Sequence, residues 1–289
     1  MNSASPPLIS KFSFLAPDYD VVLSDIWGVV HNGLAAHPHA CDALMRMRAR
    51  GGIVILVTNA PRPNDVVARQ LDRLHVPRET YDAIVSSGDV TRSVIEERRG
   101  QTLYHLGPGR DRSIFTGLDV HFAPSETADY VVCSGLEDDE VETPDDYRAR
   151  LESMLARKLF MMCGNPDVVV ERGSTLVYCA GAIADLYASM GGEVLYAGKP
   201  YRPIYDMALA KAELAAGRKI ALSRVLAVGD SVRTDLKGAR AAGVDFLFVT
   251  SGIHAEELGS REEPDGAALT ATFIAAGGMP KAVMRELRW

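Results

Sequence analysis

The chain has 289 residues, of which 31 are basic and 38 acidic, so its formal net charge is −7. Apolar residues make up 47% and charged residues 24%, which is typical of a globular protein rather than a disordered or fibrous one. No run of Lys and Arg is long enough to follow a nucleic-acid backbone, and no apolar segment has the roughly 20 residues that span a bilayer. We therefore expect neither a nucleic acid nor a membrane as a partner.

Two further features bear on location. Residues 1–14 lack a basic region followed by a continuous apolar segment, so they do not form a secretory signal. The four cysteines are scattered without a Cys-x-x-Cys pair, which argues against a zinc site. They are typical of small buried residues in a reducing compartment, and we expect the cytoplasm.

The first predicted element is the apolar run 21–24, which ends at Asp25 and is followed by Gly28. Such a short run, bounded by turn residues, predicts a buried strand. In open α/β sheets, ligands bind at the carboxyl ends of the strands. A carboxylate there can attack phosphorus or carbon, or hold a metal. Taken alone, Asp25 is better explained as a residue that caps a turn.

Strands and helices then alternate. The predicted helices are 38–50, 64–74 with Asn64 as N-cap, and about 89–98, and the predicted strands are 53–57 and 84–85. The same alternation returns after residue 194, with helices at about 203–215, 233–242 and 280–289 and strands at 225–228 and 246–249. This pattern predicts parallel β-α-β units.

The middle of the chain has a different order of predicted elements. Short strands are predicted at 102–106, 120–123, 130–134, 159–163 and 167–170. One helix is expected to open with Thr143 as N-cap and Pro144 at its first position, and another lies near 182–190. The acidic stretch 137–146 is better explained as a solvated loop and helix start than as a metal site. We predict an α/β core domain, 13–86 and 195–289, split by an inserted domain, 87–194.

Four polar motifs each follow an apolar run: Asp25, then Thr58-Asn59, then Lys199, then Gly229-Asp230-Ser231 with Asp235. Thr58 and Lys199 are weak signals singly, because ordinary turn and surface residues explain them. The ordered set resembles the four motifs of the haloacid dehalogenase (HAD) superfamily. That resemblance implies a Rossmann-like parallel sheet, hydrolase chemistry and a magnesium cofactor.

The resemblance also implies the roles of the site residues. Asp25 would be the nucleophile that forms an aspartyl-phosphate. Thr58, Asn59 and Lys199 would bind the phosphorylated substrate, with Thr58 and Lys199 also counted as catalytic. Mg²⁺ would be held by Asp25, by Asp230 and by the backbone carbonyl of Trp27, and Asp235 would orient a metal-bound water or Lys199.

The inserted segment narrows the resemblance. Its position between the second and third motifs is that of a class II cap. The runs Asn165-Pro166-Asp167, Glu171-Arg172-Gly173, Ala180-Gly181-Ala182-Ile183 and Gly198-Lys199-Pro200 resemble the class IIA group. That group contains nucleotide, sugar-phosphate and aryl-phosphate phosphatases, which implies a small phosphorylated metabolite as the substrate and a homodimer as the assembly.

One position departs from the family pattern. HAD phosphatases carry a second acid two residues after the nucleophile, where this chain has Trp27. Trp27 keeps the backbone carbonyl that binds metal, but indole has one N–H and no acceptor, so it cannot protonate a leaving group. His31 is a candidate substitute, although a histidine in a turn is more often structural. The role of His254 stays open.

Three functions are therefore compared. The leading one is a magnesium-dependent phosphatase or phosphotransferase. The second is a metal-independent dehalogenase-like hydrolase, which an aromatic residue at position 27 fits loosely but the Asp230–Asp235 motif opposes. The third is a non-catalytic protein that binds phosphorylated metabolites. Metal dependence separates the first two, and turnover separates the third.

Overall fold

The computed structural model describes residues 6–172, 175–252 and 266–289. It divides into two compact units. The core unit comprises Met1–Thr58, Ala68–Val85 and Tyr205–Trp289, and the cap unit comprises Asn59–Val67 and Ser86–Ile204. The prediction of an α/β core interrupted by an inserted α/β cap is confirmed, while the boundaries at residues 87 and 194 stay predictions.

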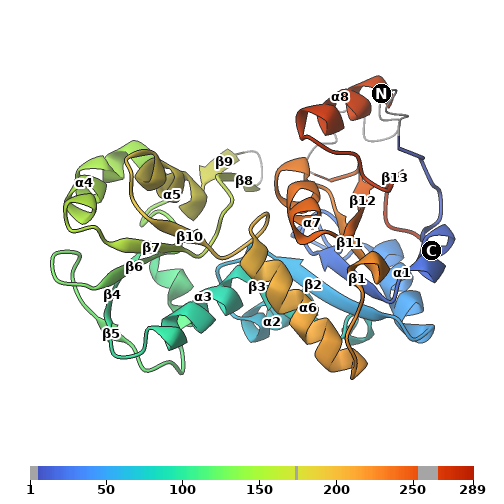
Figure 1. The fold of residues 1–289 in the computed structure, drawn as a ribbon, viewed down its shortest axis with the longest axis horizontal. Coiled ribbons are helices and arrows are strands. Elements are labelled where there is room, and N and C mark those ends of the chain that lie inside the picture. The colour runs from blue at the N-terminus through green and yellow to red at the C-terminus, as the bar shows by residue number, and fades with distance from the viewer. Residues whose placement is uncertain (1–5, 173–174, 253–265) are drawn as a thin grey trace. The chain divides into compact units, whose positions relative to one another are not determined.

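The core unit is built on a six-stranded sheet in the order β13-β12-β11-β1-β2-β3 (Figure 1). Its strands are β1 (Val21–Asp25), β2 (Ile53–Thr58), β3 (Ala83–Ser86), β11 (Val225–Gly229), β12 (Asp245–Val249) and β13 (Ala282–Met284). The central strand β1 pairs in parallel with β2 on one side and β11 on the other. Because β1, β2 and β11 run in the same direction, their carboxyl ends lie at one edge of the sheet.

Helices alternate with these strands: α1 (Pro38–Ala49), α2 (Asn64–Arg73), α6 (Arg202–Ala216), α7 (Lys237–Ala242) and α8 (Gly266–Ala275). Short 3₁₀ turns occur at Phe12–Phe14, Ala16–Asp18, Arg78–Thr80 and Leu222–Arg224. In α1, Pro38 starts the helix, Leu44 and Met47 are buried, and Gly51 follows the end with a φ of 88°. Proline near the start and a left-handed glycine beyond the end are the expected helix signals.

The cap unit contains a five-stranded parallel sheet, in the order β10-β7-β6-β4-β5, and a separate two-stranded antiparallel sheet, β8-β9. The strands are β4 (Thr102–Leu106), β5 (His121–Phe122), β6 (Tyr130–Cys133), β7 (Phe160–Cys163), β8 (Val169–Arg172), β9 (Thr175–Tyr178) and β10 (Val194–Tyr196). The helices are α3 (Ser87–Glu97), α4 (Arg148–Ala156) and α5 (Ala180–Ser189), with 3₁₀ turns at Gly109–Phe115 and Pro144–Tyr147. Buried side chains of α4 and α5 pack on β6 and β7.

Three predicted details are wrong. The segment 280–289 is not a helix: it contains the edge strand β13, in which Ala282 pairs with Leu247 of β12. Asn64 is the first residue of α2 rather than its cap, and both its backbone and side-chain nitrogens donate to Asp89. α3 begins two residues earlier than predicted, because Ser86 and Asp89 form a reciprocal capping box.

The predicted start of the second cap helix is close to what is observed. Pro144 opens a 3₁₀ turn that leads into α4, and the Asp146 carboxylate accepts hydrogen bonds from the backbone nitrogen and the hydroxyl of Thr143. Asp145 and Asp146 therefore lie in a helix start, as predicted, where their charge is favourable.

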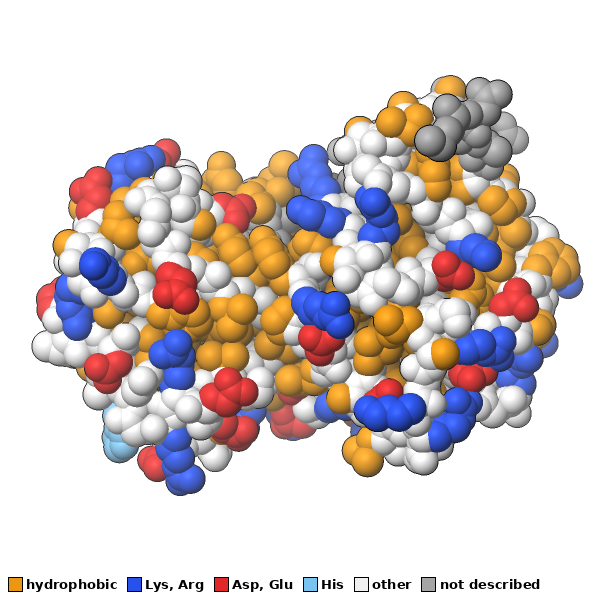
Figure 2. Space-filling model, in the orientation of Figure 1, with side chains coloured by type: hydrophobic (Ala, Val, Ile, Leu, Met, Phe, Trp, Pro, Cys, Tyr) orange, Lys and Arg blue, Asp and Glu red, His pale blue; other side chains and the backbone are white. Residues whose placement is uncertain are grey.

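Two whole-chain predictions can be compared with the structure. All four cysteines are free and buried. Within the described ranges, no helix combines the length and apolar character needed to cross a membrane. Basic and acidic side chains are interspersed on the face that Figure 2 shows.

Candidate active site

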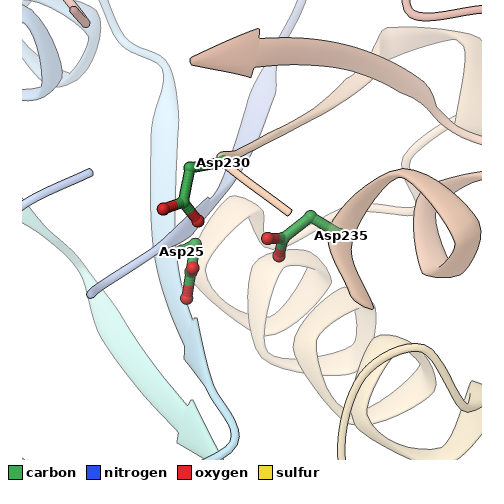
Figure 3. A group of neighbouring side chains, drawn as sticks. All are labelled: Asp25, Asp230 and Asp235. Atoms are coloured by element: carbon green, nitrogen blue, oxygen red, sulfur yellow. The ribbon is translucent and has the colours of Figure 1, made fainter. Parts of the chain in front are cut away.

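Three carboxylates meet at the edge of the core sheet. Asp25, Asp230 and Asp235 each offer an oxygen, and these three atoms all lie within 4.8 Å of one another. Figure 3 shows the three side chains as neighbours. All three residues are buried. The structure thus brings together the three acids that the sequence singled out, although Asp230 lies 205 positions after Asp25.

The register of the sheet explains this meeting. Ser24 of β1 lies opposite Val228 of β11, so Asp25 and Asp230 follow at the ends of neighbouring strands. Asp235 lies in a π-helical turn, Val232–Leu236, that begins directly after Ser231. The Ser231 hydroxyl accepts a hydrogen bond from the Thr234 backbone nitrogen at 3.3 Å. The Asp235 carboxylate in turn accepts one from the Ser231 nitrogen at 3.2 Å, which fixes it beside Asp230.

Two glycines make room for Asp230. A Cβ added to Gly28 would lie 2.1 Å from Asp230 Oδ2, and one added to Gly252 would lie 1.9 Å from the same oxygen. Gly28 also has a φ of 81°, a conformation that favours glycine. The loop that contains the Trp27–Gly28 peptide therefore lies directly against the carboxylate cluster. Sequence reasoning missed both glycines as site residues, and only the Gly28 turn position gave a signal.

The three clustered carboxylates could hold a cation. Two carboxylates 4 Å apart repel each other by about 4 kcal/mol at an effective dielectric constant of 20. A buried group of three is stable as anions only with a neutralising partner. Mg²⁺ prefers carboxylate, carbonyl and water oxygens at about 2.0–2.1 Å, and a donor set of three clustered carboxylates fits this preference.

Thr58 lies beside Asp25 in the same sheet. It is the last residue of β2, and Val57 before it is the register partner of Asp25. A hydroxyl at this strand end is suited to donate a hydrogen bond to an oxyanion next to the carboxylate. Its predicted phosphate-binding role fits this placement and stays a prediction.

Asn59 and Lys199 belong to the cap unit, where two hydrogen bonds join them. Asn59 Oδ1 accepts from the Lys199 backbone nitrogen at 2.7 Å, and Asn59 Nδ2 donates to the Lys199 carbonyl at 3.0 Å. Nδ2 also donates to Asp167 Oδ1 at 2.9 Å. Both N–H groups of the amide are therefore engaged within the cap unit. These hydrogen bonds hold the backbone of the buried Lys199, and the substrate-binding role of Asn59 stays a prediction.

His31 does not replace the missing acid. It is 2% exposed, and its Nδ1 accepts a hydrogen bond from the Gly33 backbone nitrogen at 2.9 Å. Burial, with a smaller effect from His37, lowers the pKa of His31 to about 4. The imidazole is thus neutral near pH 7 and shielded from a leaving group, which is the structural role that the sequence favoured. His254 lies outside the described residues.

Comparison with known proteins agrees with this geometry. Residues 22–121 match a family model described as haloacid dehalogenase-like hydrolase, and residues 196–275 match one described as HAD-hydrolase-like. A solved haloacid dehalogenase-like hydrolase from Brucella suis 1330 is 43% identical, with a TM-score of 0.83 over 96% of this chain and 99% of that one.

Two curated relatives are more distant. A 5'-nucleotidase, YutF, from Bacillus subtilis is 24% identical over 83% of this chain and 90% of its own length. An acid sugar phosphatase from Staphylococcus haemolyticus is 26% identical over 72% of this chain and 76% of its own length. The family matches span the strand ends that carry Asp25, Thr58 and Asp230. The chain therefore belongs to the haloacid dehalogenase-like hydrolase family, in its class IIA group, as its four motifs and its inserted segment predict.

Proposed function

We propose that this protein is a magnesium-dependent phosphatase that acts on a small phosphorylated metabolite through an aspartyl-phosphate intermediate. The observation that carries the proposal is the cluster of Asp25, Asp230 and Asp235 at the ends of neighbouring parallel strands. The named activities of the relatives, a 5'-nucleotidase and an acid sugar phosphatase, support the same reaction class.

In the first half-reaction, an Asp25 oxygen attacks phosphorus as the bond to the ester oxygen breaks, and that oxygen leaves with the bonding electron pair. Water then attacks the aspartyl-phosphate, which releases inorganic phosphate and restores the carboxylate. Ile26 donates its backbone N–H to Asp25 Oδ1 at 2.7 Å and so orients the nucleophile. Thr58 donates to a phosphoryl oxygen, and Lys199 supplies the positive charge that phosphoryl transfer requires.

Asp25, Asp230 and the Trp27 carbonyl would hold Mg²⁺, which offsets negative charge on the substrate and the carboxylates. Gly28 follows that carbonyl and lies against Asp230, which supports this ligand set. Asp235 accepts from the Ser231 backbone nitrogen and would orient a water or Lys199. The cluster favours this reading over a metal-independent dehalogenase, which has no use for three adjacent acids.

Trp27 and His31 together predict the selectivity of the reaction. Neither offers a carboxyl or a titrating imidazole to the leaving oxygen. Leaving groups that depart without a proton, such as aryl oxides and acyl groups, should therefore react faster than alkyl groups. We further propose a reducing compartment, the cytoplasm, because all four cysteines are free and buried. A homodimer remains the assembly that the resemblance implies.

A screen of phosphorylated metabolites tests the proposal. The purified protein would be incubated with nucleotides, sugar phosphates and aryl phosphates, with magnesium or with excess chelator, while released phosphate is measured. We expect turnover that requires magnesium. Equal turnover in chelator would favour the dehalogenase-type alternative, and tight binding without any phosphate release would favour the non-catalytic alternative.

A further inference from the structure

The indole of Trp27 presents an unusual surface beside the carboxylate cluster. It is 51% exposed, whereas the neighbouring site residues Asp25 and Asp230 are buried. Consecutive Cα atoms are 3.8 Å apart, so the Cα atoms of Asp25 and Trp27 lie within about 7 Å of each other. The backbone position that carries this large, half-exposed aromatic ring is therefore next to the proposed nucleophile.

Contacts on one side of the ring hold it in place. The His31 imidazole packs edge-to-face with it, at 5.3 Å between ring centroids and 76° between planes. At Gly33, an added Cβ would lie 2.3 Å from the tip of the indole, so the ring rests directly on the backbone there. Trp27 has few other orientations available while His31 and Gly33 stay where they are.

The backbone beneath the ring is also rigid. Gly28 donates its N–H to the His31 carbonyl at 2.8 Å, and both Val30 and His31 donate to the Ile26 carbonyl. The Asn32 side chain accepts from the backbone nitrogens of Leu34 and Ala35. The loop supports one side of Trp27 and leaves about half of it open.

We infer that Trp27 is a preorganised stacking platform that selects phosphate esters whose organic group is a planar aromatic ring. The inference rests on the proposed function, because it places the phosphate at Asp25. A substrate held there has its organic group within a few ångströms of the ester oxygen, and Trp27, whose indole is half exposed, is only two residues from Asp25. Aromatic pairs gain about 0.5–1.5 kcal/mol beyond the burial of area, because offset or edge-to-face rings attract each other. A saturated ring of similar size gains only the burial of area.

Non-hydrolysable probes test this without any leaving group. Binding of benzylphosphonate and cyclohexylmethylphosphonate would be measured by calorimetry on the full chain with magnesium. We expect the wild type to bind the aromatic probe about 2- to 10-fold more tightly, the fold-change that corresponds to an aromatic pair. Trp27→Leu should bring this ratio to about 1, while Trp27→Phe should keep most of it. Leu34→Ala, which removes an 88% exposed side chain from the same loop, should leave the ratio unchanged.

Each contrary outcome has a distinct meaning. If the wild type binds both probes equally, or if Trp27→Leu keeps the aromatic preference, the stacking role is wrong while phosphate recognition stands. If Leu34→Ala loses the preference as fully as Trp27→Leu, the loop as a whole, rather than the indole, sets it. If neither phosphonate binds and p-nitrophenyl phosphate is not hydrolysed, the proposed function fails and the inference fails with it.

Discussion

At position 27, binding a metal is a task for the backbone carbonyl, and giving a proton to the leaving group is a task for the side chain. The backbone carbonyl of Trp27 is available to a metal whatever the side chain is, and the close approach of Gly28 to Asp230 puts that segment at the cluster. Its indole cannot donate a proton to a departing alkoxide at neutral pH. The sequence alone predicted both statements, but only the structure excludes His31 as the substitute, because that imidazole is buried and bonded to Gly33.

Trp27→Asp should gain activity on alkyl phosphates. The new carboxyl would stand beside three others, which raises its pKa and makes it a better acid-base group at neutral pH. General acid-base help is worth about 10²–10⁴-fold, so at least a 10-fold rise in kcat for an alkyl phosphate is expected, with little change for an aryl phosphate. Because the indole is half exposed, its removal should cost little stability. A folded, magnesium-binding variant with no gain would show that another group already transfers the proton.

The hydrogen-bond partners of Asn59 could not be predicted from its residue type. A polar residue after a strand is a reasonable substrate ligand, yet here its amide bonds Lys199 and Asp167. Asn59→Leu should leave the buried backbone nitrogen and carbonyl of Lys199 without the hydrogen bonds from Asn59, which should lower the free energy of unfolding by about 1–3 kcal/mol. It should also lower kcat, because Lys199 is no longer held in position. Urea unfolding and steady-state kinetics would measure both effects. Unchanged stability and kcat would mean that Lys199 is held by other contacts.

At the scale of elements, the sequence predicted best where an apolar run ended at a turn. β1, β2, β11 and β12 were all found in this way. The edge strand β13 was not predicted. It has only three residues, which are too few to show a periodic pattern, and it is defined by its pairing with β12. The π-helical turn Val232–Leu236 was also missed, since its i-to-i+5 geometry leaves no mark on apolar spacing. That turn matters, because it places Asp235.

The start of α3 offers a test at this scale. Ser86 accepts from the Asp89 backbone nitrogen at 3.0 Å and donates to the Arg62 carbonyl at 2.5 Å. Ser86→Ala should therefore lower the free energy of unfolding by about 1–2 kcal/mol. Ser189→Ala, at the exposed end of α5, is the matched control and should change it by less than about 0.5 kcal/mol. Equal urea midpoints for the two variants would contradict the capping role.

For the whole molecule, the parallel sheet explains why distant motifs meet. Parallel pairing was predicted from the β-α-β pattern, and the observed strand order brings Asp25, Thr58 and Asp230 to neighbouring strand ends. The sequence could not show how Asn59 and Lys199 are joined within the cap unit, because that contact links residues 140 positions apart. Nor could the sequence show that Gly252 packs against Asp230, because this contact depends on the tertiary structure.

The carboxylate cluster predicts a metal-dependent stability. Magnesium that binds only the folded state should raise the melting temperature, with a stabilisation of about 2.7 kcal/mol at 100 times its Kd. Asp230→Asn should abolish most of this shift. In chelator, the same variant should melt higher than the wild type, because one source of repulsion among the three acids is gone. A magnesium shift of wild-type size in Asp230→Asn would place the ion elsewhere.

The most direct test is the hydrolysis of p-nitrophenyl phosphate by the wild type and by Asp25→Asn, both in magnesium. The account predicts that the wild type releases nitrophenol and that the variant, which keeps the shape of the side chain but lacks the nucleophilic carboxylate, loses turnover while its thermal midpoint shows it to be folded. Hydrolysis by folded Asp25→Asn at the wild-type rate would contradict the account.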